Sequence, residues 1–264
     1  MKQRKRPPKI VTMNISASGF RDYRSNAERT EIATTFIQSA PYSNISAIFY
    51  PSGYLLAKTE SEINPLVRPL IRQAKRSKVS FVLGVDLQEI KSYRYASPDF
   101  PAMLNAVKNG KIPCFLVVYD ATIGKTSILR QRSASSYHAH SKMLPDNVMV
   151  PHILDVAGVP VQIIFCGEIY DTRLLSGDAP KTAVILGHRT MTRLTQTMRG
   201  KSKRGFTLLN SEHRTGKYGM SFCFKRGEEC GYYHKEQIEM VSGFWIELAC
   251  WKIGARGGIR YISK

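Results

Sequence analysis

The sequence predicts an α/β domain in which helices cover the faces of β-sheets. Over the first third of the chain, short apolar runs alternate with helical patterns in the order strand, helix, strand, helix, strand. The later part carries short apolar runs separated by turn residues, with few helical patterns, which is typical of hairpins and paired strands. Together these two observations favour a layered α/β architecture over an all-helical or all-β one.

Individual elements follow from the spacing of apolar residues. A first helix is expected over residues 26–39, where Ala33, Phe36 and Ile37 recur at helical spacing, and a second over residues 64–78. A hairpin turn is expected at residues 122–124. The expected strands cover residues 10–15, 45–50, 79–85, 115–119, 126–129, 161–165, 183–186, 206–209, 220–224 and 244–249.

The length and composition predict a single folded domain. The chain has 264 residues, of which 43% are hydrophobic and 10% aromatic, so it can bury a sizeable core. We expect a basic N-terminal extension over residues 1–9, one domain over residues 10–251, and a Gly-rich basic tail over residues 252–264.

Cysteine usage and hydropathy bear on the compartment. Five widely spaced cysteines are an odd number in a long chain, which indicates a reduced, intracellular protein and not a disulfide scaffold. No apolar run approaches the roughly 18–20 residues that cross a bilayer. We therefore expect a cytoplasmic protein without a membrane partner.

Basic residues dominate the charge balance. Lys and Arg number 39 against 20 Asp and Glu, giving a formal net charge of +19. No acidic residue lies between Asp178 and Glu212, and many of the basic ones fall in the stretch 181–204. Nucleic acid, another polyanion or an anionic substrate could use such a surface, although a solvated face accounts for it equally well.

Two patterns that suggest a metal or a nucleotide do not hold. The run Gly124-Lys125-Thr126-Ser127 lacks the earlier glycine of a phosphate-binding loop, because position 119 is Tyr119. Four possible zinc ligands have no paired spacing of the kind zinc sites use: His213, Cys223, Cys230 and His234. We expect no cofactor and no metal.

Cys166 is the strongest candidate for chemistry. It directly follows the apolar strand 161–165 and precedes Gly167-Glu168. Sites in α/β folds are built at the carboxyl ends of strands, where a thiol can be exposed and a nearby cation can lower its pKa. A buried structural thiol is the alternative.

Cys166 belongs to a series of motifs that resembles the carbon–nitrogen hydrolase (nitrilase) superfamily over most of the chain. In that family, a strand ending in Pro-Glu is followed by a strand ending in Leu-Gly-Val, a hairpin with a glycine turn, and a strand running into Cys-Tyr-Glu/Asp. The counterparts here are residues 45–50 with Pro51-Ser52, then Leu83-Gly84-Val85, residues 117–129, and Cys166-Gly167-Glu168.

The resemblance implies a four-layer αββα sandwich, usually assembled as a homodimer, with a Glu-Lys-Cys triad. Cys166 matches the nucleophile, and Ser52 stands at the position of the general-base glutamate. Either Arg132 or Lys142 stands at the position of the lysine. Glu168 and Asp171, just after Cys166, are possible substitute acids, although family residues at this place usually structure the turn.

The substitution at position 52 bears directly on activity. Serine is not a ready base at neutral pH, and loss of a positioned general base typically costs about 10²–10⁴-fold in rate. An arginine carries the charge of a lysine but differs in shape, so it is not a conservative replacement.

Two hypotheses follow. The first is an amidase-like hydrolase acting on carbon–nitrogen bonds other than peptide bonds, in which the Cys166 thiol attacks a small amide or nitrile. The basic composition favours an anionic substrate. The alternative is a catalytically inactive relative that binds a polyanion such as nucleic acid through residues 181–204.

Overall fold

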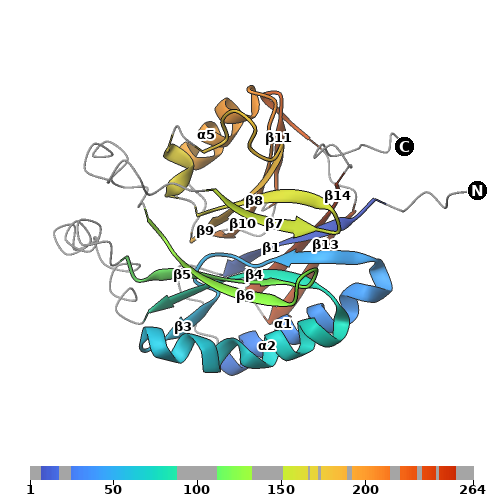
Figure 1. Ribbon diagram of the computed structural model, residues 1–264, viewed down its shortest axis with the longest axis vertical. Coiled ribbons are helices and arrows are strands. Elements are labelled where there is room, and N and C mark those ends of the chain that lie inside the picture. Colours follow the sequence, from blue (N-terminus) through green and yellow to red (C-terminus); the bar gives the residue numbers. More distant parts are fainter. Residues whose placement is uncertain are drawn as a thin grey trace, which may run out of the picture.

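The computed structural model describes residues 7–17, 25–87, 112–132, 151–165, 167–171, 174–188, 192–214, 221–230, 234–241 and 244–253 (Figure 1). Its helices are α1 (Asn26–Ser39), α2 (Ile63–Ser77) and α5 (Thr192–Ser202), with short 3-10 turns η1 (Ala40–Ser43), η2 (Glu60–Glu62) and η5 (Glu168–Tyr170). The strands are β1 (Lys9–Ala17), β2 (Ile45–Phe49), β3 (Leu55–Ala57), β4 (Ser80–Leu87), β5 (Cys114–Asp120), β6 (Lys125–Arg130), β7 (His152–Val156), β8 (Val159–Phe165), β9 (Thr182–Gly187), β10 (Thr207–Arg214), β11 (Cys223–Lys225), β12 (Glu228–Glu229), β13 (His234–Val241) and β14 (Phe244–Lys252).

In the described chain these elements form four layers (Figure 1). Helices α1 and α2 cover a sheet with the order β6-β5-β4-β2-β1-β14-β13, in which β3 also pairs with β4. A second sheet, β7-β8-β9-β10-β11-β12, lies over the first, and α5 covers its outer face. The sheets join where β1 pairs with β10 at Ile15 and Ser16. The expected αββα sandwich is confirmed.

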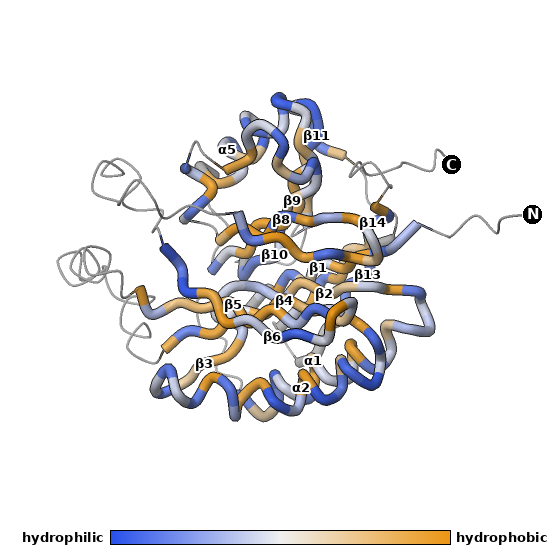
Figure 2. The backbone as a smooth tube through the Cα atoms, in the orientation of Figure 1, coloured by the Kyte–Doolittle hydropathy of each residue, from blue (hydrophilic) through white to orange (hydrophobic). Residues whose placement is uncertain are grey.

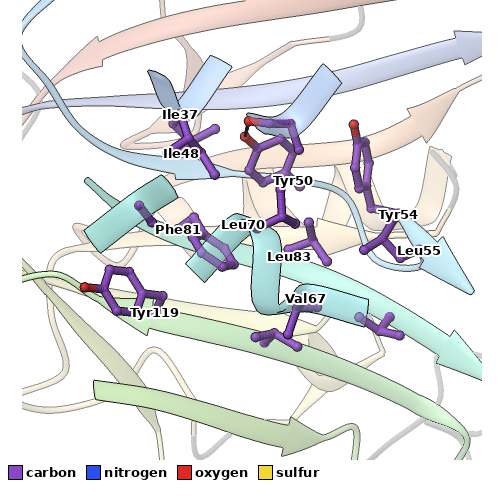
Figure 3. Close-up of a cluster of buried hydrophobic side chains, with 14 of the residues drawn as sticks. Ile37, Ile48, Tyr50, Tyr54, Leu55, Val67, Leu70, Phe81, Leu83 and Tyr119 are labelled. Atoms are coloured by element: carbon purple, nitrogen blue, oxygen red, sulfur yellow. Dashed lines mark hydrogen bonds between the residues drawn. The ribbon is translucent and has the colours of Figure 1, made fainter. Parts of the chain in front are cut away.

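Buried apolar residues of the described chain fall into three clusters that match the spaces between layers. One cluster lies between the first sheet and helices α1 and α2 and includes Ile37, Leu70 and Leu83 (Figure 3). Another lies between the two sheets and includes Val82 and Phe165, and a third lies under α5. Each sheet is therefore covered on both faces.

Strand β4 shows how the sequence dictates this layering. All eight of its residues are buried, because one face meets the helices and the other meets the second sheet. Phe81, Leu83 and Val85 belong to the helix-side cluster, whereas Val82 belongs to the inter-sheet cluster. Strands buried on both faces appear as continuous apolar runs without alternation, and Figure 2 shows such hydrophobic strands at the centre of the molecule.

Helix α2 is amphipathic, as its sequence predicts. Ile63, Val67, Leu70 and Ala74 are buried at intervals of three and four residues, which places them on one face of the helix. Figure 2 shows hydrophilic and hydrophobic segments alternating along this helix, as a helix with one buried face requires.

Some elements were not expected from the sequence. Helix α5 was not expected, because its buried apolar residues are Leu194 and Met198, which are too few to give a clear helical pattern in the sequence. Among the described strands, β13 pairs with β14 alone, and it carries mostly polar residues. The expected strand over residues 220–224 begins later, at Cys223.

In the described part of the chain, no helix has both the length and the apolar character needed to span a membrane.

Candidate functional site

Ser52 connects the two sheets at the carboxyl ends of their strands. It follows β2, and the backbone of this segment lies directly on Gly84 of β4, whose N–H donates to the Pro51 carbonyl at 3.2 Å. The Ser52 side chain is buried, and its hydroxyl donates to the carbonyl of Leu186 in β9 at 2.9 Å. The residue that the sequence analysis matched to the family's glutamate thus makes a hydrogen bond between the two sheets.

Arg132 and Glu168, both selected from the sequence, are in direct contact. The backbone N–H of Arg132 and its Nε both donate to Oε1 of Glu168, at 3.0 and 3.3 Å. Glu168 lies in η5 and is completely buried. Burial raises the pKa of the Glu168 carboxyl, although the Arg132 guanidinium and its hydrogen bonds act in the opposite direction. Arg132 and Glu168 thus form an ion pair at this edge of the fold.

The Arg132–Glu168 contact lies close to the strand end that precedes Cys166. Phe165, the last residue of β8, pairs with Leu186 of β9, the same residue that accepts the Ser52 hydrogen bond. Cys166 and Lys142 themselves lie outside the described residues. Of the two candidates for the lysine position, Arg132 is the one that the described structure places at this edge.

A group that the sequence analysis missed lies at the same edge: Asp86, Cys114 and His188. Nε2 of His188 lies 3.0 Å from Oδ1 of Asp86. One donor atom from each of the three residues lies within 4.8 Å of the other two. Asp86 is completely buried, Cys114 is nearly so, and the His188 side chain is 22% exposed. The structure thus gathers a carboxylate, a thiol and an imidazole at one point.

Strand register explains why this group lies beside Ser52. Side chains alternate across a strand, so Asp86 shares the inter-sheet face of β4 with Gly84, which contacts Ser52. Cys114 is the direct cross-strand partner of Asp86 in β5. His188 comes two residues after Leu186, the acceptor of the Ser52 hydroxyl. The available sequence signals were a single Asp inside an apolar strand and a single His after another.

His152 lies within electrostatic reach of Arg132. It is on β7, paired with Ile163 of β8. Burial, together with the positive charge of Arg132, lowers the pKa of His152 to about 4. Its imidazole is therefore neutral at neutral pH in the folded protein.

The His152 environment predicts acid sensitivity. Since the folded pKa of about 4 lies below the unfolded value of 6.5, the unfolded state binds more protons between these values, and stability falls as the pH drops from 6.5 towards 4. We expect His152→Gln to reduce this loss by about 1 kcal/mol at pH 5, as measured by urea unfolding at pH 5 and 7.5. Parallel pH dependences for the wild type and the variant would contradict the assignment.

Three cations of the basic stretch 181–204 contact aromatic rings or a carbonyl of the fold, although Lys181 and Arg199 are exposed. The Lys181 ammonium lies 4.9 Å from the centre of the Phe206 ring, and the Arg199 guanidinium lies 5.3 Å from that of Phe224. Lys201 donates to the Asp171 carbonyl at 2.7 Å, and burial lowers its pKa to about 8. These contacts do not favour the alternative hypothesis of a polyanion-binding module.

Comparisons with known proteins identify the fold. No protein-family model and no curated protein matches the sequence. A mutant of the amidase from Nesterenkonia sp. AN1, whose active-site cysteine carries the acetamide moiety of fluoroacetamide, is similar in structure with a TM-score of 0.59. The two sequences are 11% identical, and the match covers 94% of this chain and 92% of the amidase.

Another mutant of the Nesterenkonia AN1 amidase, described as a nitrilase-superfamily protein, gives a TM-score of 0.58 at 10% identity, over 96% of this chain and 94% of that one. A further structure of an amidase from Nesterenkonia sp. gives 0.56 at 11% identity, over 94% and 92% of the respective chains. The chain therefore has the fold of nitrilase-superfamily amidases, and the resemblance seen in the sequence is confirmed at the level of the fold.

Proposed function

We propose that this protein is an amidase-type carbon–nitrogen hydrolase that uses the Cys166 thiol as its nucleophile. The observation that carries the proposal is the contact between Arg132 and Glu168, which ties the end of the β5–β6 hairpin to the turn directly after Cys166. In a fold shared with nitrilase-superfamily amidases, this contact assembles residues selected at matching family positions. The substrate class we propose is small amides.

The Arg132 guanidinium supplies the positive charge that favours a thiolate at Cys166, because a nearby cation lowers the pKa of a thiol. The thiolate sulfur then forms a bond to the amide carbon. The negative charge that develops on the amide oxygen is stabilised by a cationic group such as the guanidinium. The proton that the thiol loses reaches the amide nitrogen by way of solvent water, and the C–N bond breaks to release ammonia and leave a thioester. Water then attacks the thioester, releases the carboxylic acid and restores the thiol.

Ser52 determines which step is slow. The Ser52 hydroxyl donates a hydrogen bond to the Leu186 carbonyl. Because this hydroxyl is neutral, it cannot take a proton from water as a carboxylate would. We further propose that Glu168 positions Arg132 and is not the base, since its Oε1 accepts two hydrogen bonds from Arg132. We therefore propose that thioester formation outruns its hydrolysis and that an acyl-enzyme accumulates.

Intact-protein mass spectrometry tests this proposal. The full chain is incubated with a panel of small amides that includes acetamide and an anionic half-amide such as succinamate, and released ammonia is measured in parallel. We expect a single acyl adduct, one equivalent of ammonia released as it forms and slow ammonia release afterwards, all abolished by Cys166→Ala. The control is Cys250→Ala, which removes a half-buried cysteine on β14. Absence of both adduct and ammonia for the whole panel would contradict the proposal.

Ser52→Ala in the same assay tests the role of that side chain. Since the hydroxyl is not the base, we expect ammonia release to fall by less than about tenfold, well short of the 10²–10⁴-fold loss that removal of a general base causes. A loss of that larger size in a folded variant would show that Ser52 transfers protons.

A further inference from the structure

We propose that Asp86, Cys114 and His188 form a binding site for a divalent transition-metal ion of the Zn²⁺ type, at the edge where the two sheets meet. One donor atom from each residue lies within 4.8 Å of the other two. In a tetrahedral zinc site, bonds of 2.0–2.3 Å place ligand atoms about 3.4–3.8 Å apart. Side-chain adjustments of about 1 Å would thus bring these three atoms onto one ion.

The donor set selects the class of metal. A thiolate, an imidazole and a carboxylate are all zinc ligands, and the thiolate favours soft or borderline ions. Mg²⁺ and Ca²⁺ prefer sites built from oxygen atoms, so they do not fit a site with sulfur and nitrogen donors. The three residues leave a fourth position of a tetrahedron for water or another ligand, as zinc sites with three protein ligands do.

The surroundings of the three side chains suit an ion. The Asp86 carboxyl is completely buried, and Cys114 belongs to the apolar cluster between the sheets. The carboxylate is already held beside the His188 imidazole at 3.0 Å, so two of the three donor groups are adjacent before an ion binds. The His188 side chain is 22% exposed, so an ion and water can reach the site from the solvent at this side chain.

The backbone holds the ligands in place before any ion binds. Asp86 and Cys114 are opposed in the β4–β5 ladder, with the Leu87 N–H donating to the Pro113 carbonyl at 2.9 Å beside them. His188 follows β9, which the Ser52 hydroxyl ties to the first sheet. An ion here would join both sheets and would release the thiol proton of Cys114 to solvent on binding. The proposal does not depend on the amidase activity proposed above.

Cobalt spectroscopy of the full chain, free of any histidine tag and stripped of metal with a chelator, tests the site. We expect one equivalent of Co²⁺ to bind and to give a near-ultraviolet thiolate-to-cobalt band together with visible bands of a tetrahedral ion. Added Zn²⁺ should abolish these bands. Cys114→Ser should lose the thiolate band, and Asp86→Asn should weaken binding at least about tenfold.

His188→Gln allows a second measurement. Because the His188 side chain is partly exposed, this variant is expected to fold. Zn²⁺ should raise the melting temperature of the wild type but not that of His188→Gln. Cys230→Ser, which removes another partly buried cysteine, is the matched control and should keep the cobalt spectrum. Absence of cobalt bands and of a zinc-dependent melting shift in the wild type would overturn the proposal. Bands that survive Cys114→Ser but vanish in Cys230→Ser would overturn it too.

Discussion

Gly84→Ala is expected to destabilise the protein by about 3 kcal/mol, the upper end of the usual cost of overpacking. A Cβ at this position would lie 2.3 Å from the Ser52 Cα, 2.4 Å from the Gly53 nitrogen and 2.5 Å from the Pro51 oxygen. All three atoms belong to the backbone, so no side-chain rotation relieves the overlap. Urea unfolding at neutral pH measures the change in the free energy of unfolding.

Gly200→Ala is the matched control for this prediction. Gly200 lies in α5, and a Cβ there would meet no atom within 4 Å. An alanine inside a helix is more favourable than a glycine by roughly 0.5–1 kcal/mol, so this variant should be as stable as the wild type or more so. A Gly84→Ala variant within 1 kcal/mol of the wild type would show that the segment after β2 does not lie on β4.

The size of this effect matters for the site as well as for stability. The backbone of residues 51–53 fills the space that a side chain at position 84 would occupy, and this close approach brings Ser52 within reach of Leu186. A methyl group at position 84 must displace the backbone of residues 51–53, and with it Ser52 and its hydrogen bond to Leu186. Asp86 shares the same strand and face, so the packing at Gly84 positions both halves of the candidate site.

Sequence patterns predicted those elements whose burial is periodic or continuous. Helices α1 and α2 and strand β4 match the expected ranges to within about two residues at each end, since one-sided or two-sided burial leaves a clear pattern. Strand β7 and helix α5 were missed because so few of their residues are apolar and buried. Their existence depends on partners elsewhere in the fold, which a local pattern does not contain.

The candidate site was predicted only where neighbouring residues form a motif. Ser52 and Glu168 were found because each belongs to a series that resembles the nitrilase superfamily, and the contact of Glu168 with Arg132 agrees with that interpretation. Asp86 and His188 were missed because they are single residues separated by 102 positions. Their proximity depends on how the two sheets stack, which no spacing along the chain reveals.

Arg132→Met is expected to produce the second large loss, about 3 kcal/mol at pH 8, because removing one partner of a buried ion pair leaves an uncompensated charge. The charge left behind is the Glu168 carboxylate, which is completely buried. Burial already raises the pKa of Glu168 in the wild type, and loss of the Arg132 cation raises it further. A carboxyl whose pKa is higher in the folded state than in the unfolded state favours folding when it is protonated. The loss should therefore shrink as the pH falls from 8 towards 5.

A double-mutant cycle separates this electrostatic effect from the loss of packing. Glu168→Gln keeps the shape of the side chain and removes its charge, so Arg132→Met combined with Glu168→Gln should recover much of the stability at pH 8 and show little dependence on pH. Coupling of this kind is expected for residues in direct contact, whereas independent sites give additive changes. Strict additivity, or an equal loss for Arg132→Met at pH 5 and pH 8, would mean that the two side chains do not interact as an ion pair. In that case the positive charge of Arg132 would act on a group of the site other than Glu168.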